Sequence, residues 1–209
     1  MDGFLAKLDQ TGARLWATYY GGAGSGIVNN DLEDASCVAT DQTGNVYLGG
    51  GTNSSTGIAT AGSFQSVKPA FGKRDGFVAK FNSAGVRQWA TYLGGSVNLF
   101  DGSFVTGLAV SVSNEIVVHG TTDAQNFPVT TCTYQTPTPA NLVNIRTQFI
   151  TTLSNGGNLL CSGYIGWGVG NRTYYYVGGS AAVFGEHAFF VATSESPGNW
   201  VRYPITTGA

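Results

Sequence analysis

The sequence predicts an all-β fold built from repeated four-stranded units. Three observations lead to this prediction. Glycine is abundant, with 31 residues, and charged residues make up only 11% of the chain, a composition typical of turns and pleated sheets and not of surface helices. A long segment of sequence recurs at a nearly constant spacing. Each copy carries the alternation and turn residues of β-hairpins, so we expect helix to be scarce.

The repeat is clearest at its start. Residues 2–22 match residues 75–95 at an offset of 73, with thirteen of twenty-one positions identical. The second half of the unit also recurs, because residues 38–48 match residues 108–118 at an offset of 70. The difference of three residues falls in a loop, where repeat scaffolds tolerate insertions.

Later copies are weaker. Phe149, Gly157 and Tyr164 follow the second copy at an offset of 72, with Cys161 where Trp89 would fall. The chain therefore divides as one repeat domain over residues 1–209. We expect three to four units, with boundaries at about 2–74, 75–146, 147–186 (shortened) and 187–209 (partial).

Within a unit the local signals are those of strands. Residues 77–81 alternate, residues 82–85 supply a turn, and residues 86–93 return as a second strand rich in aromatic and β-branched side chains. A second pair of strands, 38–41 and 45–48, is joined by a turn in which Gly44 can take a positive φ. Four short strands per unit is the content of one propeller blade. We therefore predict a propeller-like array of four-stranded antiparallel blades, either incomplete or closed by oligomerisation.

At these residues the sequence resembles the bacterial β-propeller repeat family called SBBP. Its units read approximately D-G/A-F-V-A-K, then W-x-T-Y-x-G-G, then I-A-V-D-x-x-G-N-V-Y-V, and residues 2–65 and 75–135 carry nearly all of this pattern. The resemblance implies a propeller-like architecture in secreted or cell-surface bacterial proteins, often long multidomain ones. It implies no defined activity.

Charge and hydropathy argue against two classes of partner, nucleic acid and the interior of a membrane. A formal net charge of −2, with ten scattered Lys and Arg, argues against nucleic acid. No apolar run approaches the length that spans a bilayer. The chain opens on a strand pattern without the charged and apolar regions of a signal peptide, so we expect either a cytosolic chain or one that begins after a removed leader. The extracellular or cell-surface location is what the resemblance implies. A larger parent chain or a homo-oligomer is also compatible with the repeat.

One acidic loop, residues 29–34, gathers oxygen donors suited to calcium. The candidate metal ligands are Asp31, Glu33 and Asp34. A solvated acidic loop is the preferred interpretation and calcium the alternative; no other cofactor is expected. Residues 41–45 also look calcium-like, but Asp and Asn beside a Gly are typical of a hairpin turn.

The sequence predicts no enzyme. Neither His119 nor His187 lies near a nucleophile motif, and we expect structural or surface roles for both. Aromatic side chains in the irregular later copies could stack on sugar rings, with burial in the core as the preferred alternative. The candidate ligand-binding residues are Trp167, Tyr174, Tyr175 and Trp200.

The three cysteines fit no metal spacing. We expect them mainly as small buried hydrophobic residues. A Cys132–Cys161 disulfide is the alternative.

Recurring residues such as Trp16 and Trp89, or Lys7 and Lys80, indicate a scaffold, because every unit needs them whereas a catalytic site needs one asymmetric cluster. The expected function is a non-enzymatic structural or interaction module that binds a protein or a glycan. Two alternatives stay open: a self-assembling β building block with paired edge strands, and an accessory domain of a carbohydrate-active enzyme.

Overall fold

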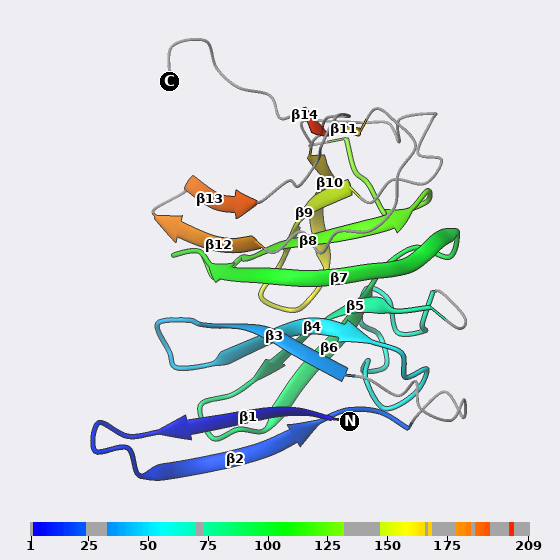
Figure 1. The fold of residues 1–209 in the computed structure, drawn as a ribbon. Helices are drawn as coiled ribbons and strands as arrows, with labels where there is room; N and C mark the ends of the chain where they lie inside the picture. Colours follow the sequence, from blue (N-terminus) through cyan, green and yellow to red (C-terminus); the bar gives the residue numbers. More distant parts are fainter. Residues whose placement is uncertain are drawn as a thin grey trace.

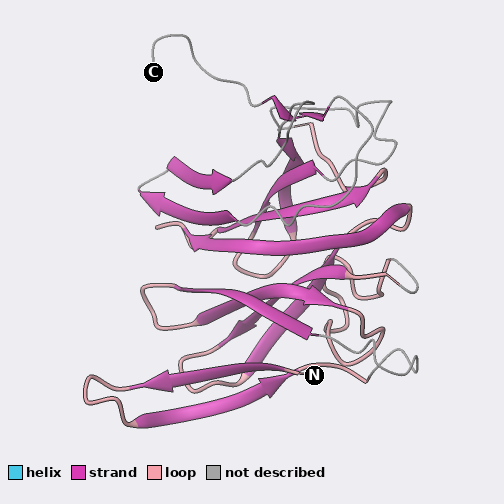
Figure 2. Cartoon of the chain, viewed as in Figure 1, coloured by secondary structure: helices cyan, strands magenta, loops and turns pink. Residues whose placement is uncertain are grey.

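The computed structural model describes residues 2–23, 33–69, 73–131, 147–165, 167–168, 179–184, 187–192 and 201–202. Every helix or strand assigned within these ranges is a β-strand, which confirms the all-β prediction (Figure 2). The strands are β1 (Gly3–Leu8), β2 (Arg14–Tyr20), β3 (Glu33–Thr40), β4 (Val46–Thr52), β5 (Asp75–Phe81), β6 (Arg87–Leu93), β7 (Asn98–Val110), β8 (Ile116–Ala124), β9 (Thr147–Leu153), β10 (Leu159–Ile165), β11 (Trp167–Gly168), β12 (Gly179–Phe184), β13 (His187–Ala192) and β14 (Val201–Arg202).

Two antiparallel sheets have four strands each, in the orders β3-β4-β5-β6 and β10-β9-β8-β7. The remaining strands form the two-stranded pairs β1-β2, β12-β13 and β11-β14. Figure 1 shows these layers following one another from β1-β2, in blue, through the two four-stranded sheets to β12-β13, in orange. The described strands form an open stack with β1-β2 at one end.

The sheets do not coincide with the sequence units. The expectation was one four-stranded blade per unit, but β4 pairs with β5 across the boundary between the first and second units. Each four-stranded sheet therefore joins the second hairpin of one unit to the first hairpin of the next. The reason is the connection: β4 leads into β5 within one sheet, whereas the segment after β2 leads into a different sheet.

The two large sheets are copies of each other in register as well as in order. Val46 pairs with Phe81 in the first sheet, and Ile116 pairs with Leu153 in the second. These are the positions that the offsets of 70 and 72 residues equate. The sequence repeat is thus a repeat of hydrogen-bonded structure.

Two hydrophobic clusters lie between successive layers. Leu5 and Tyr20 of the β1-β2 pair pack with Phe77 and Tyr92 of the next sheet, and the Tyr20 and Phe77 ring centroids are 5.2 Å apart. A second cluster contains Trp89 of that sheet together with residues of β7, β8, β9 and β10. Strands β4, β5 and β8 are buried along their whole length, as expected for strands covered on both faces.

None of the described residues belongs to a helix long and apolar enough to cross a membrane.

Candidate functional site

The hairpin turns share one hydrogen-bonding pattern. Asp9 and Asn82 hold corresponding positions, and each Oδ1 accepts two backbone N–H groups of its own turn at 2.8–3.0 Å. A glycine follows three residues later, with φ of 84° at Gly12 and 81° at Gly85. The corresponding turn of the third copy has Ser154 followed by Gly157, with φ of 82°. Glycine is favoured there because other L-residues rarely adopt a positive φ.

The turn at Asp41 has the same design. Asp41 Oδ1 accepts the backbone N–H groups of Thr43 and Asn45 at 2.9 and 3.0 Å, and Gly44 has a φ of 80°. Burial raises the pKa of Asp41, but hydrogen bonds from Asn45, Thr43 and Tyr47 outweigh it and lower the pKa to about 2. The hairpin-turn interpretation of residues 41–45 is confirmed, because the carboxylate is used by the turn itself.

These turns receive side chains from the preceding layer. Trp16 Nε1 donates to the carbonyl oxygen of Ser83 at 3.0 Å, and Lys7 Nζ reaches the same oxygen at 3.4 Å. The Trp16 ring lies so close to Gly85 that an added Cβ there would be 2.9 Å from Trp16 Cδ2. We call this arrangement of a Trp, a Lys and the following turn the Trp–turn contact.

The next pair of layers repeats it. Trp89 Nε1 donates to the carbonyl oxygen of Asn155 at 2.8 Å, and Lys80 Nζ donates to Asn155 Oδ1. An added Cβ at Gly157 would lie 2.8 Å from the Trp89 ring. The recurring Lys and Trp of the first two units therefore share one structural role, the joining of each layer to the next.

The series ends in the third copy. Thr152 and Cys161 hold the positions, 72 residues on, that Lys80 and Trp89 hold in the second. Neither side chain can reproduce an indole that donates while covering a glycine. The β9-β10 hairpin thus receives a Trp–turn contact but does not offer one.

Polar groups gather around the second Trp–turn contact. The Tyr47 hydroxyl lies 3.1 Å from Asp41 Oδ2 and 3.2 Å from Asn155 Oδ1. Lys80 Nζ lies 5.3 Å from the centroid of the Tyr47 ring, within cation–π range. Burial raises the pKa of Tyr47 and lowers the pKa of Lys80. These groups bind one another across two sheets, so their chemistry is used in assembly.

Buried carboxylates lie where β3, β4 and β5 meet. Glu33 is buried and accepts hydrogen bonds from Thr52 Oγ1 at 3.0 Å and from Ser54 Oγ. Asp75 forms a 2.6 Å ion pair with Lys68, and both side chains are buried. Burial, together with the nearby charges of Asp75 and Glu33, raises the pKa of Tyr92 to about 12.

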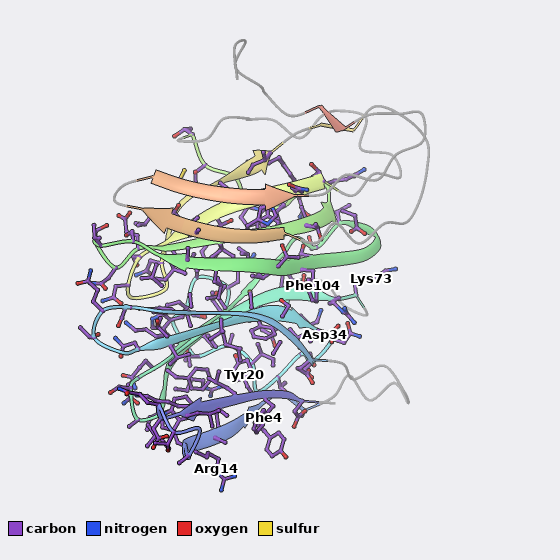
Figure 3. All side chains as sticks on the ribbon, turned by 60° about the vertical axis from the view of Figure 1, so that its left-hand side comes forward. Phe4, Arg14, Tyr20, Asp34, Lys73 and Phe104 are labelled. Atoms are coloured by element: carbon purple, nitrogen blue, oxygen red, sulfur yellow. The ribbon has the colours of Figure 1, made fainter. Side chains whose placement is uncertain are left out.

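The two predicted metal ligands that the structure describes, Glu33 and Asp34, do not share one face of β3. Asp31 lies outside the described residues. Glu33 is buried against Thr52 and Ser54, whereas Asp34 is half exposed and pairs with Arg74 at 3.1 Å, since adjacent residues of a strand point to opposite faces. Figure 3 shows Asp34 near Phe104, whose ring centroid is 5.5 Å from the Arg74 guanidinium carbon. Within the described ranges, no group of three or more His, Cys, Asp and Glu could hold a metal.

Of the predicted sugar-stacking residues, Tyr174, Tyr175 and Trp200 lie outside the described residues. Trp167 lies in β11, where it pairs with Arg202 of β14.

His119 is a core residue. It is fully buried, and its Nδ1 and Nε2 lie 3.0 and 3.2 Å from Thr106 Oγ1 and Gln148 Oε1. Burial lowers its pKa. His119 faces Gly107 across the ladder, whereas the first copy has Gly49 facing Cys37. The larger residue of the pair is therefore on β3 in the first copy and on β8 in the second. His187 begins β13.

The cysteines differ from the preferred expectation. Cys161 is disulfide-bonded, so it is not a free hydrophobic residue. Cys37 is a free, partly buried thiol whose pKa is raised to about 11 by burial. Cys132 lies outside the described residues.

One face of the β1-β2 hairpin is apolar and exposed. Phe4 and Tyr19 are 58% and 74% exposed, although their counterparts Phe77 and Tyr92 are 0% and 1% exposed. Sequence reasoning missed this site; the signal was the presence of apolar residues on both faces of Gly3–Leu8.

No protein-family model and no curated protein sequence matches this chain. The resemblance to the SBBP family therefore stays a prediction.

Proposed function

We propose that this chain is a non-enzymatic, propeller-type structural and interaction module of a secreted or cell-surface bacterial protein, in which successive sheets act as blades and bind a protein or glycan partner. The observation that carries the proposal is the repeated Trp–turn contact. The residues that recur between the units are used to join layers, which is what a repeat scaffold requires.

The described polar clusters support a structural role. His119 is bonded to Thr106 and Gln148 in the core. Asp41 is engaged by its own turn. Catalytic groups are usually directed towards a concave pocket, whereas these groups are directed into sheet contacts.

The disulfide at Cys161 supports the secreted or surface location. Disulfides persist in oxidising compartments and are rare in the reducing cytosol.

The variant Lys80→Met/Trp89→Phe tests the scaffold proposal. It keeps apolar bulk but removes the Lys80 and Trp89 donors to Asn155, and leaves the Tyr47 hydroxyl bond to Asn155 Oδ1 in place. We expect hydrogen exchange in β7–β10 to become faster than in β3–β6, because the two sheets no longer open as one unit. Unchanged hydrogen exchange in both sheets would contradict the proposal that these contacts join the blades. Lys7→Met is a milder comparison, since its bond to Ser83 is exposed.

A glycan array probed with the purified chain tests the glycan partner. Binding that is lost in Trp200→Ala or Tyr174→Ala would support stacking on sugar rings. An array without hits would remove the glycan and leave a protein as partner.

The second candidate function is a self-assembling β building block. The exposed apolar face of β1-β2 and the unpaired edge of β1 favour it, because unpaired strand edges promote association. Sedimentation of a strict monomer at high protein concentration would exclude it.

A further inference from the structure

We infer that the exposed face, the free edge and the turn of the β1-β2 hairpin together form a docking site for one further repeat unit of this same type. The inference rests on the proposed scaffold function and deepens it by naming the partner. It is carried by a comparison within the molecule, since β5-β6 and β9-β10 are later copies of β1-β2.

The exposed face is continuous and apolar. Alternate residues of both strands point outward, and they are Phe4, Ala6, Leu8, Leu15, Ala17 and Tyr19. Phe4 pairs with Tyr19 across the strands, and their rings are 5.8 Å apart. The opposite face, with Leu5 and Tyr20, is already buried against the next sheet. Figure 3 shows Tyr20 on the side of the hairpin that faces this sheet. A sheet that is apolar on both faces is typical of an inner layer.

The copies show what covers such a face. Phe77, Phe81 and Tyr92 are at most 3% exposed, and they belong to the cluster that contains Leu5 and Tyr20 of the preceding layer. The face that covers them is therefore a β1-β2-type hairpin. By the same relation, the face of Phe4 and Tyr19 fits the Leu5 and Tyr20 side of another unit.

The edge of β1 is the second component. Among the described strands β1 pairs only with β2, whereas its copies β5 and β9 are each paired on both sides. The strands that occupy this edge in the copies are β4 and β8. Both carry small residues at the centre, Gly49 and Gly50 in one and Gly120 in the other. A strand of that kind, added antiparallel, would complete a four-stranded sheet on β1-β2.

The turn of β1-β2 is the third component. Gly85 and Gly157 each lie against a Trp ring from the preceding layer, but an added Cβ at Gly12 would meet nothing within 4 Å. Gly12 has the same positive φ, and Asp9 organises its turn in the same way. The turn is thus formed as an acceptor for a Trp–turn contact.

One repeat unit supplies all three components. In this chain the unit that precedes Asp75 places its first hairpin against the Phe77 face and the Gly85 turn, and its second hairpin on the edge of β5. Applied to β1-β2, the same relation requires a unit with a Lys and a Trp at the positions of Lys7 and Trp16. A second copy of this chain fits less well, because its third-copy hairpin, β9-β10, has Thr152 and Cys161 there.

A tandem protein tests the inference. Residues 1–74 are added directly before Asp2 of the full chain, which reproduces the spacing that precedes Asp75. We expect amide hydrogen exchange in the original Gly3–Leu8 to slow by about tenfold or more, towards the rate of Asp75–Phe81. Unchanged exchange in Gly3–Leu8 would overturn the inference.

Two matched controls sharpen the result. Leu48→Pro in the added copy alone should abolish the slowing, because proline cannot donate within a central strand. Phe4→Ser/Tyr19→Ser in the original hairpin should leave the natural chain's unfolding midpoint unchanged but abolish the slowing in the tandem protein. Persistence of the slowing in either control would count against the site. If the natural chain instead dimerises with Gly3–Leu8 protected, the occupant is a second copy and the inference is overturned.

These outcomes are distinct from a failure of the scaffold proposal. That proposal fails if Lys80→Met/Trp89→Phe leaves exchange in both large sheets unchanged, a result that does not involve β1.

Discussion

At the scale of single residues, the repeated glycines combine two roles. Each permits the positive φ of its turn, and Gly85 and Gly157 also leave room for an indole ring. Gly12 has only the first role, because the space above it is open. Gly12 therefore serves as a control that shows the effect of backbone strain alone, without the effect of packing against a ring.

Alanine at these glycines should separate the two roles. Gly12→Ala should cost about 1–2 kcal/mol, the strain of a left-handed backbone at a non-glycine residue. Gly157→Ala should cost about 1–3 kcal/mol more, because its Cβ would displace the Trp89 ring. Urea unfolding of both variants measures the difference. Equal losses would mean that the indole adapts freely.

The Asp41 turn should make stability depend on pH. Its pKa in the folded protein, about 2, lies below the ordinary 3.8, so Asp41 contributes stability that is complete above pH 3.8 and is lost as the pH falls towards 2. Asp41→Asn keeps an acceptor but does not titrate. Its free energy of unfolding should therefore fall less steeply than that of the natural chain over this range. Parallel pH profiles would contradict the assignment.

At the scale of elements, corresponding strand pairs of the two sheets place their larger side chain on opposite strands. Cys37 faces Gly49 in β3-β4, and Gly107 faces His119 in β7-β8. An added Cβ at Gly49 would lie 2.9 Å from Cys37 Sγ and 2.8 Å from Val105 Cγ1. Each pair therefore has room for one large side chain, which explains why His119 can replace a glycine of the repeat.

This exchange predicts a non-additive pair of substitutions. Gly49→His should destabilise the chain by about 1–3 kcal/mol through overpacking. Cys37→Gly/Gly49→His should lose less than the sum of the single variants, with an interaction energy of about 0.5–3 kcal/mol, because the glycine makes room for the imidazole. Urea unfolding of the two single variants and the double variant gives the measurement. Strict additivity would show that Val105 limits the space instead.

At the scale of the whole molecule, layers are joined in one direction. Each hairpin of the β1-β2 type covers the next layer and donates to its turn, until Thr152 and Cys161 end the series in β9-β10 (Figure 1). The stack therefore differs chemically along its length. β1-β2 presents an apolar face with an open turn at one end, whereas β10 in the second four-stranded sheet contains a disulfide at Cys161.

The disulfide should stabilise the whole chain. Reduction should lower the free energy of unfolding by about 2–4 kcal/mol, as for other structural disulfides, and Cys161→Ser should mimic reduction. Cys37→Ser should keep the full response to reductant, since Cys37 is a free thiol. Thermal unfolding with and without reductant measures these effects. An identical midpoint in both conditions would mean that the bond constrains little.

The strands and turns of the first two units, and the positions that these two units share, could be predicted from local sequence patterns. Alternation and turn residues act over a few neighbouring residues, so the hairpin at residues 77–93 and the turn at Asp41 could be predicted. Tertiary structure alone decided that a sheet joins halves of two units, that Trp89 bonds the turn at Asn155, and that Phe4 is exposed while Phe77 is buried. These outcomes depend on which layer lies beside which strand. Identical residues in two copies do not by themselves indicate which layer will cover them.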